Sequence, residues 1–147
     1  MPDKETLERA AEDKAEGKSP STQAGEFVRE EIEHVREGKH GARSARQAIA
    51  IGLSKARRAG VDLPAPKKGT ASKRTREQAT RDLRKGKSPS KKKSAKRSRA
   101  TFQALKREGH SAASKTALSR QAHRAAAKRS AASRSRAAKK AAATRKK

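Results

Sequence analysis

The chain has 147 residues and a formal net charge of +26, with 38% charged and 31% hydrophobic residues. Such a chain, with two Phe and no Trp or Tyr, has too little apolar surface to offset the entropy of ordering one large core. Cysteine is absent and no run of about 18 apolar residues occurs, which excludes disulfides, thiol chemistry and a membrane-spanning helix. The N-terminus lacks the apolar core of a secretion signal, so we expect a cytoplasmic protein.

The positive charge is confined to one half of the chain. Residues 1–66 contain 12 Lys and Arg against 12 Asp and Glu, whereas residues 67–147 contain 29 against three. A neutral module followed by a polycation is typical of a folded head with a polyanion-binding tail. We therefore expect a neutral helical module over residues 1–61, a Pro/Lys/Gly linker over 62–71 and a basic region over 72–147.

A short charged helix is expected over residues 2–16, where Leu7 is the only large apolar side chain. Ser19 and Pro20 then suit the N-cap and first turn of a second helix, which ends near residue 37. One face of this second helix is apolar and the other is acidic. The apolar stripe over residues 24–35 consists of Ala24, Phe27, Val28, Ile32 and Val35, and the acidic face of Glu26, Glu30, Glu31 and Glu33.

A third helix over residues 42–59 has the clearest pattern, with apolar positions three and four residues apart. Ser44 suits its N-cap and Gly60 the left-handed position after its end, while Gly52 predicts a close helix–helix contact. Because the turn over residues 38–41 is short, the second and third helices should form a hairpin. This hairpin is the expected core, and its stripes over residues 24–35 and 45–56 are the expected surface for self-association.

The second half of the chain repeats features of the first. After a fourth expected helix over residues 72–85, Gly-Lys-Ser-Pro-Ser at 86–90 repeats residues 17–21, and Arg-Glu-Gly at 107–109 repeats residues 36–38. This spacing predicts a degenerate second copy of one helical unit, depleted of core residues and filled with charge. The predicted fold class is therefore all-α, with a small helical hairpin or three-helix module followed by a long, partly disordered or conditionally helical basic half.

Three stretches resemble known families. The run over residues 42–60 resembles a motif of small basic bacterial proteins of uncharacterised function, which implies a helical DNA-binding protein without catalytic residues. The Ser-Pro-Ser-Lys-Lys-Lys sequence at 88–93 resembles Ser-Pro-basic elements of linker histones, and residues 111–147 are similar in composition to the tails of linker histones and bacterial histone-like proteins. The motif match is carried by Arg43, Ser44, Arg46, Gln47, Ala48, Ile49, Ala50, Ile51, Gly52, Leu53, Ser54, Ala56, Arg57, Arg58, Ala59 and Gly60.

The dense cations predict binding to DNA phosphates without sequence specificity, with a histone-like role in compacting or bridging nucleoid DNA. Structured RNA, or a ribosome-associated role, stays open, as does a cationic adaptor that recruits a protein through the acidic helix over residues 26–37. The four histidines are scattered and expected to be exposed, so no metal, cofactor or enzymatic activity is expected. The predicted nucleic-acid-binding residues are Arg43, Arg46, Arg57, Arg58, Lys87, Lys91, Lys92, Lys93, Lys96, Arg97, Arg99, Lys106, Arg107, Arg120, Arg124, Lys128 and Arg129.

Overall fold

The computed structural model of the chain describes residues 1–88 and 94–145. Over these residues the fold is all-α, as the sequence predicts, and ordered helices continue to Arg145. The expected disorder of the basic half is therefore not supported, since its Ala, Lys and Arg residues favour helix. The elements are α1 (Lys4–Ala15), α2 (Pro20–Arg36), α3 (Ala45–Arg58), α4 (Lys73–Gly86), α5 (Ala95–Lys106), the 3₁₀ helix η1 (Ser111–Ala113), α6 (Lys115–Ala127) and α7 (Ala131–Arg145).

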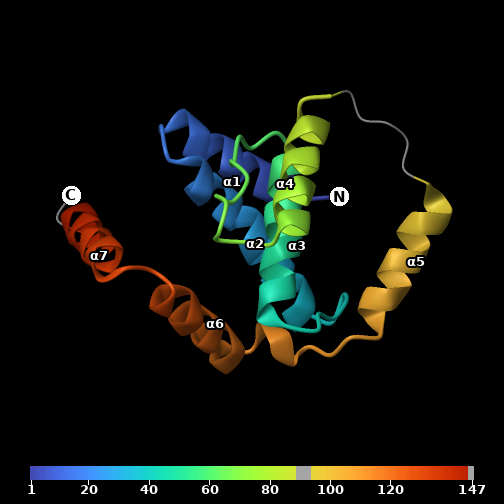
Figure 1. Cartoon of the computed structure of the whole chain (residues 1–147). Coiled ribbons are helices and arrows are strands. Elements are labelled where there is room, and N and C mark those ends of the chain that lie inside the picture. Colours follow the sequence, from blue (N-terminus) through green and yellow to red (C-terminus); the bar gives the residue numbers. More distant parts are fainter. Residues whose placement is uncertain (89–93, 146–147) are drawn as a thin grey trace.

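The predicted hairpin of α2 and α3 forms the centre of the molecule, with α1 packed on α2 and α4 packed on α3 (Figure 1). Its ends follow the local signals in the sequence. Ser19 and Ser44 accept hydrogen bonds from the backbone N–H groups of Thr22 and Gln47 and so cap α2 and α3. Gly60, with φ +98°, ends α3 in a left-handed turn that returns the next residue onto the helix.

Gly52 lies where α3 crosses α2, which confirms the predicted close contact. A Cβ atom at this position would lie 2.6 Å from Val28 Cα and 2.9 Å from the carbonyl oxygen of Phe27. Both are backbone atoms of α2, so no side-chain rotation could relieve the clash. The two helices therefore approach this closely only because residue 52 has no side chain.

The core consists of two small clusters of buried residues. In the first, Phe27 is 1% exposed and packs with residues of α1, α3 and the segment after α3. In the second, Val35 packs against Ala112 and Ala113 of η1, which lie more than 70 residues further along the chain. The basic half thus contributes to the core, although the sequence predicts a core in the hairpin alone.

Helix α1 docks through smaller side chains than the sequence suggests. Leu7, its only large apolar side chain, is 41% exposed, whereas Thr6 and Ala10 are buried against α2. Small side chains allow close approach of the two helix backbones, and the ion pair between Arg9 and Glu26, at 2.7 Å, adds to the contact. The helix is therefore docked despite its weak apolar pattern.

Helix α4 is held to α3 by Asp82, which is 1% exposed. Its carboxylate accepts hydrogen bonds from Ser54 Oγ at 2.7 Å, Arg58 Nε at 2.7 Å and Gln78 Nε2 at 3.1 Å. Ala79 is buried one turn earlier, and Gly86 at the end of α4 sits directly against the carbonyl of Arg57. Three donors around one buried carboxylate satisfy its charge and determine how α4 is placed.

We expect Asp82→Asn to loosen α4 from the bundle, because the amide presents N–H groups to a site built from donors. The free energy of unfolding should fall by about 1–3 kcal/mol, measured by urea denaturation with circular dichroism. The matched control is Glu77→Gln on the exposed side of the same helix, where the change should stay within about 0.5 kcal/mol. Equal effects of the two substitutions would contradict a specific role for Asp82.

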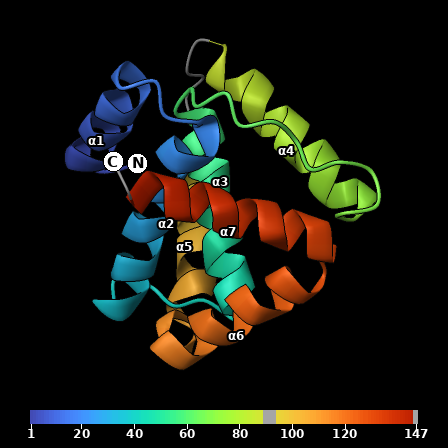
Figure 2. The same cartoon turned by 90° about the vertical axis from the view of Figure 1, so that its left-hand side faces the viewer.

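The remaining helices project from the bundle on opposite sides. Helix α5 stands to one side of α1–α4, and α6 and α7 lead away on the other (Figure 1). Viewed from that second side, α7 lies in front of the bundle (Figure 2). Within the described part of the chain, none of α5, α6 and α7 contains a buried residue. These helices therefore offer almost their whole circumference to a partner.

Candidate nucleic-acid interface

Most of the predicted phosphate-binding cations are exposed. Arg43 and Arg46 lie near the start of α3, Arg58 lies at its end, and Lys87 follows α4. The other exposed predicted cations lie on or just after α5 and α6. Lys91, Lys92 and Lys93, with most of the Ser-Pro element, lie outside the described residues. The exposed predicted cations are Arg43, Arg46, Arg58, Lys87, Lys96, Arg97, Arg99, Lys106, Arg107, Arg120, Arg124, Lys128 and Arg129.

The prediction that Arg57 binds nucleic acid is wrong, because this residue is buried and its side chain binds the protein backbone. Its guanidinium donates to the carbonyl oxygens of Leu63 at 3.1 Å and Pro64 at 3.3 Å, which fastens the linker to the end of α3. Burial lowers the pKa of Arg57 from its ordinary value, against a smaller opposing effect of Asp82. The neighbouring Arg58 is exposed but its Nε is already bonded to Asp82. Both guanidinium groups are therefore already bonded within the protein, which makes them less suitable for binding phosphate than the other predicted cations.

Helix α5 is exposed along its length, and so are its cations. Ser94 caps it by accepting a hydrogen bond from the backbone N–H of Arg97. Phe102 is 43% exposed, and Lys106 Nζ lies 5.1 Å from the centre of its ring, within the range of a cation–π contact. The end of α5 and the turn after it are anchored to the bundle, since the N–H groups of Gly41 and Ala42 donate to the carbonyls of Leu105 and Gly109, each at 3.0 Å.

Helix α6 presents a regular row of cations. Arg120, Arg124 and Lys128 are spaced four residues apart and so lie along one side of the helix. All three are exposed, and no ion pair joins any of them to a carboxylate within the described residues. Ser114 caps the helix by accepting a hydrogen bond from the Ala117 N–H. The row is a positive edge about two turns long.

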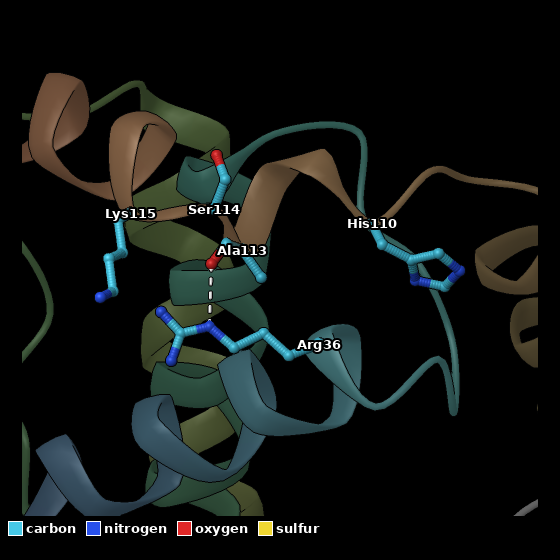
Figure 3. A pocket seen from close by; sticks show the side chains of 5 residues that line it. All are labelled: Arg36, His110, Ala113, Ser114 and Lys115. Atoms are coloured by element: carbon cyan, nitrogen blue, oxygen red, sulfur yellow. Dashed lines mark hydrogen bonds between the residues drawn. The ribbon is translucent and has the colours of Figure 1, made fainter.

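A shallow pocket of about 460 Å³ lies where the basic half docks on α2. Arg36 reaches up from α2, and its Nε donates to the Ala113 carbonyl at 3.0 Å (Figure 3). Lys115 and His110 lie on either side of this bond, and Ser114 is the remaining lining residue (Figure 3). No carboxylate from residues 1–88 or 94–145 lines the pocket, so its electrostatic potential favours an anion such as a phosphate group.

Several exposed cations lie outside the predicted set of binding residues. Arg36 and Lys115 line the pocket, where the segment after α5 meets the end of α2. Exposed cations also lie along α4 and α7. Both segments are rich in residues that favour helix, so their exposed cations could have been predicted from the sequence. These are Lys73, Arg74, Arg81, Arg84, Lys85, Arg134, Arg136, Lys139, Lys140 and Arg145.

The acidic face of α2 is smaller than predicted. Glu30 and Glu31 are 3% and 0% exposed and lie under the N-terminus and the α2–α3 turn. Burial alone would raise the pKa of Glu30, but the hydrogen bond from the Asp3 N–H and the ammonium of Lys55 outweigh it and lower that pKa. Burial likewise opposes charge on Lys55, yet contacts with Glu31 and Glu30 raise its pKa. The negative charge facing solvent on α2 is reduced accordingly.

A model of a family of unknown function (DUF6496) matches residues 13–69 of the chain. The matched stretch covers the end of α1, the α2–α3 hairpin and the linker, and stops before α4. No curated protein and no solved structure matches the chain. Across the described residues, no helix combines the length and apolar character needed to cross a bilayer. What the chain does must therefore be argued from its surface.

Proposed function

We propose that this protein binds duplex DNA through its phosphate backbone, without sequence specificity, in a histone-like role. The observation that carries the proposal is the charge of residues 67–147, which hold 29 Lys and Arg against three acids. Of those three, Asp82 is buried and bonded, and Glu108 lies 3.5 Å from Arg43. The helices of this half therefore offer cations with almost no internal partner among the described residues, and phosphate is the counter-charge that suits them.

The exposed side chains favour backbone contact over base reading. Lys and Arg are the commonest polar residues of α5–α7, whereas the amide side chains that usually read bases are sparse there. Single-strand binding would need aromatic side chains for stacking. Phe27 is buried in the core, which leaves Phe102 as the exposed aromatic ring. Both features favour a regular duplex over unstructured single strands.

The placement of the helices supports a role in bridging two DNA duplexes as well as in coating one. Helix α5 lies on one side of the bundle, and α6 with α7 on the other (Figure 1). Two basic surfaces separated by a folded bundle can contact two duplexes at once. This arrangement is the basis for proposing compaction or bridging of DNA in the bacterial nucleoid.

The test is fluorescence anisotropy of a labelled random duplex titrated with the full-length protein at several salt concentrations. With six to ten phosphates neutralised, affinity should fall by about 10³- to 10⁵-fold between about 50 and 200 mM salt. An immobilised duplex should also retain a second, labelled duplex when the protein is present. Weak binding with little response to salt would refute the proposal.

Competition with structured RNA tests the alternative that the sequence leaves open. If a folded RNA displaces the duplex at equal phosphate concentration and with higher affinity, the natural ligand is RNA. The adaptor alternative, which depends on the acidic face of α2, has less support, because Glu30 and Glu31 are buried. The stripes expected to mediate self-association are likewise used within the hairpin, where Ala24, Val35 and Ala48 are 0% exposed.

A further inference from the structure

A cluster of acidic and imidazole side chains lies beneath the N-terminus, away from the basic surface. Asp3 comes from the segment before α1, Glu31 and His34 from α2, and His40 from the α2–α3 turn. One ligand atom each from Glu31, His34 and His40 lie within 4.8 Å of one another, and the same holds for Asp3, Glu30 and His34. The scattered histidines predict exposed side chains, and this prediction is wrong for two of them: His40 is 7% exposed and His34 is half-buried.

Each histidine donates its outer ring nitrogen and turns the other toward carboxylates. His40 Nδ1 donates to the Gly41 carbonyl at 3.1 Å, which leaves Nε2 facing Glu31 Oε1 at 3.3 Å. His34 Nε2 donates to Asp3 at 3.1 Å, which leaves Nδ1 3.9 Å from Glu30 Oε1. Metal-binding histidines are held in this way, with one nitrogen fixed by a carboxylate or carbonyl and the other free to ligate.

The separation of the His40 and Glu31 atoms suits a shared metal ion better than a shared proton. A hydrogen bond between an imidazolium and a carboxylate is about 2.7–2.9 Å long. Two ligands about 2.0–2.1 Å from a tetrahedral zinc ion lie about 3.3–3.4 Å apart. The observed 3.3 Å between Nε2 and Oε1 matches the second arrangement.

Glu31 is the independent evidence that this cluster needs a ligand. Its side chain is 0% exposed, and among the described residues its Oε1 atom, which faces His40, accepts no hydrogen bond. Its Oε2 atom is paired with the Lys55 ammonium, whose Nζ lies 2.7 Å from it and 3.0 Å from Glu30 Oε1. A buried carboxylate oxygen left without a partner is costly, and a cation shared with His40 would complete its coordination.

We propose that Glu31, His34 and His40 form a binding site for a divalent transition metal, with Glu30 or a water molecule as the fourth ligand and Asp3 orienting His34. Two imidazoles with carboxylates are a donor set typical of zinc. The local charge also fits. The carboxylates of Asp3, Glu30 and Glu31 and the ammonium of Lys55 sum to −2, which a divalent ion neutralises. Bound there, the metal would tie the N-terminal segment to α2 and the following turn. The site does not depend on nucleic-acid binding.

The test is calorimetric titration of the metal-stripped full-length protein with Zn²⁺, followed by thermal unfolding with and without Zn²⁺. We expect one ion per chain, a raised melting temperature, and visible absorption typical of tetrahedral coordination when Co²⁺ replaces Zn²⁺. His40→Gln should weaken binding by about 100-fold or more, and Asp3→Asn by about 10-fold. His34→Gln provides a second ligand variant if His40→Gln fails to fold, which circular dichroism would reveal.

Two further variants separate a built site from surface binding. Lys55→Gln removes the competing ammonium and should tighten Zn²⁺ binding by about tenfold or more, an effect that general loss of stability could not produce. His123→Gln, on exposed α6, should leave the affinity unchanged. The proposal is overturned if Zn²⁺ fails to bind, or if His123→Gln and His40→Gln reduce binding equally.

Discussion

Replacing three cations on one side of α6 is expected to reduce DNA affinity by about 10²- to 10³-fold at about 0.1 M salt. The variant Arg120→Gln, Arg124→Gln and Lys128→Gln removes three of the proposed phosphate contacts while keeping residues that favour helix. Each lost contact should lower the slope of log affinity against log salt by about 0.9, so the three together lower it by about 2.7. Fluorescence anisotropy over a salt series measures both quantities.

The matched control removes the same charge from the neutral half, as Lys4→Gln, Lys14→Gln and Arg29→Gln. Lys4 and Arg29 already face carboxylates, at 3.4 Å from Glu8 and 3.1 Å from Glu33. The salt slope should therefore stay close to that of the unmodified protein. If both triple variants lowered the slope equally, binding would depend on net charge alone and not on the row along α6.

Adding one methyl group at Gly52 is expected to break the central hairpin. In Gly52→Ala the new Cβ would meet backbone atoms of Val28 and Phe27 at 2.6–2.9 Å, so α2 and α3 must move apart. We expect a loss of about 2–3 kcal/mol in the free energy of unfolding, although alanine normally gains about 1 kcal/mol over glycine inside a helix. Thermal and urea unfolding followed by circular dichroism measure the change.

Gly25→Ala is the control for this effect. Gly25 lies inside α2, and a Cβ there would meet no atom within 4 Å among the described residues. The substitution should therefore stabilise the protein by about 0.5–1 kcal/mol, which is opposite in sign to the change at Gly52. Stabilisation by both substitutions would show that α2 and α3 do not approach each other as closely as described.

Local signals in the sequence were sufficient for the helix ends and for the hairpin. Ser19 and Ser44 cap their helices, and Gly60 ends α3, because capping depends on residues within one turn of the helix end. The contact at Gly52 was also predictable, since glycine weakens a helix and suits its interior mainly where another backbone comes close. The basic surface followed directly from composition, because Lys and Arg with no apolar neighbours cannot be buried.

Tertiary structure alone decided which polar residues are buried. Glu31, His40 and Arg57 have the same local patterns as exposed residues, and each is covered by a segment that is not its helical neighbour: the turn, the N-terminus or the linker. The burial of Ala112 and Ala113 was not predictable either, because nothing in the local sequence distinguishes them from the many exposed alanines nearby. Charge, caps and periodicity are properties of short stretches, so the sequence by itself determined the first four helices, the hairpin and the polycationic half, but not the order of α5–α7. Burial depends on which distant segments pack together, so only the folded chain revealed the docking of η1 and the histidine–carboxylate cluster.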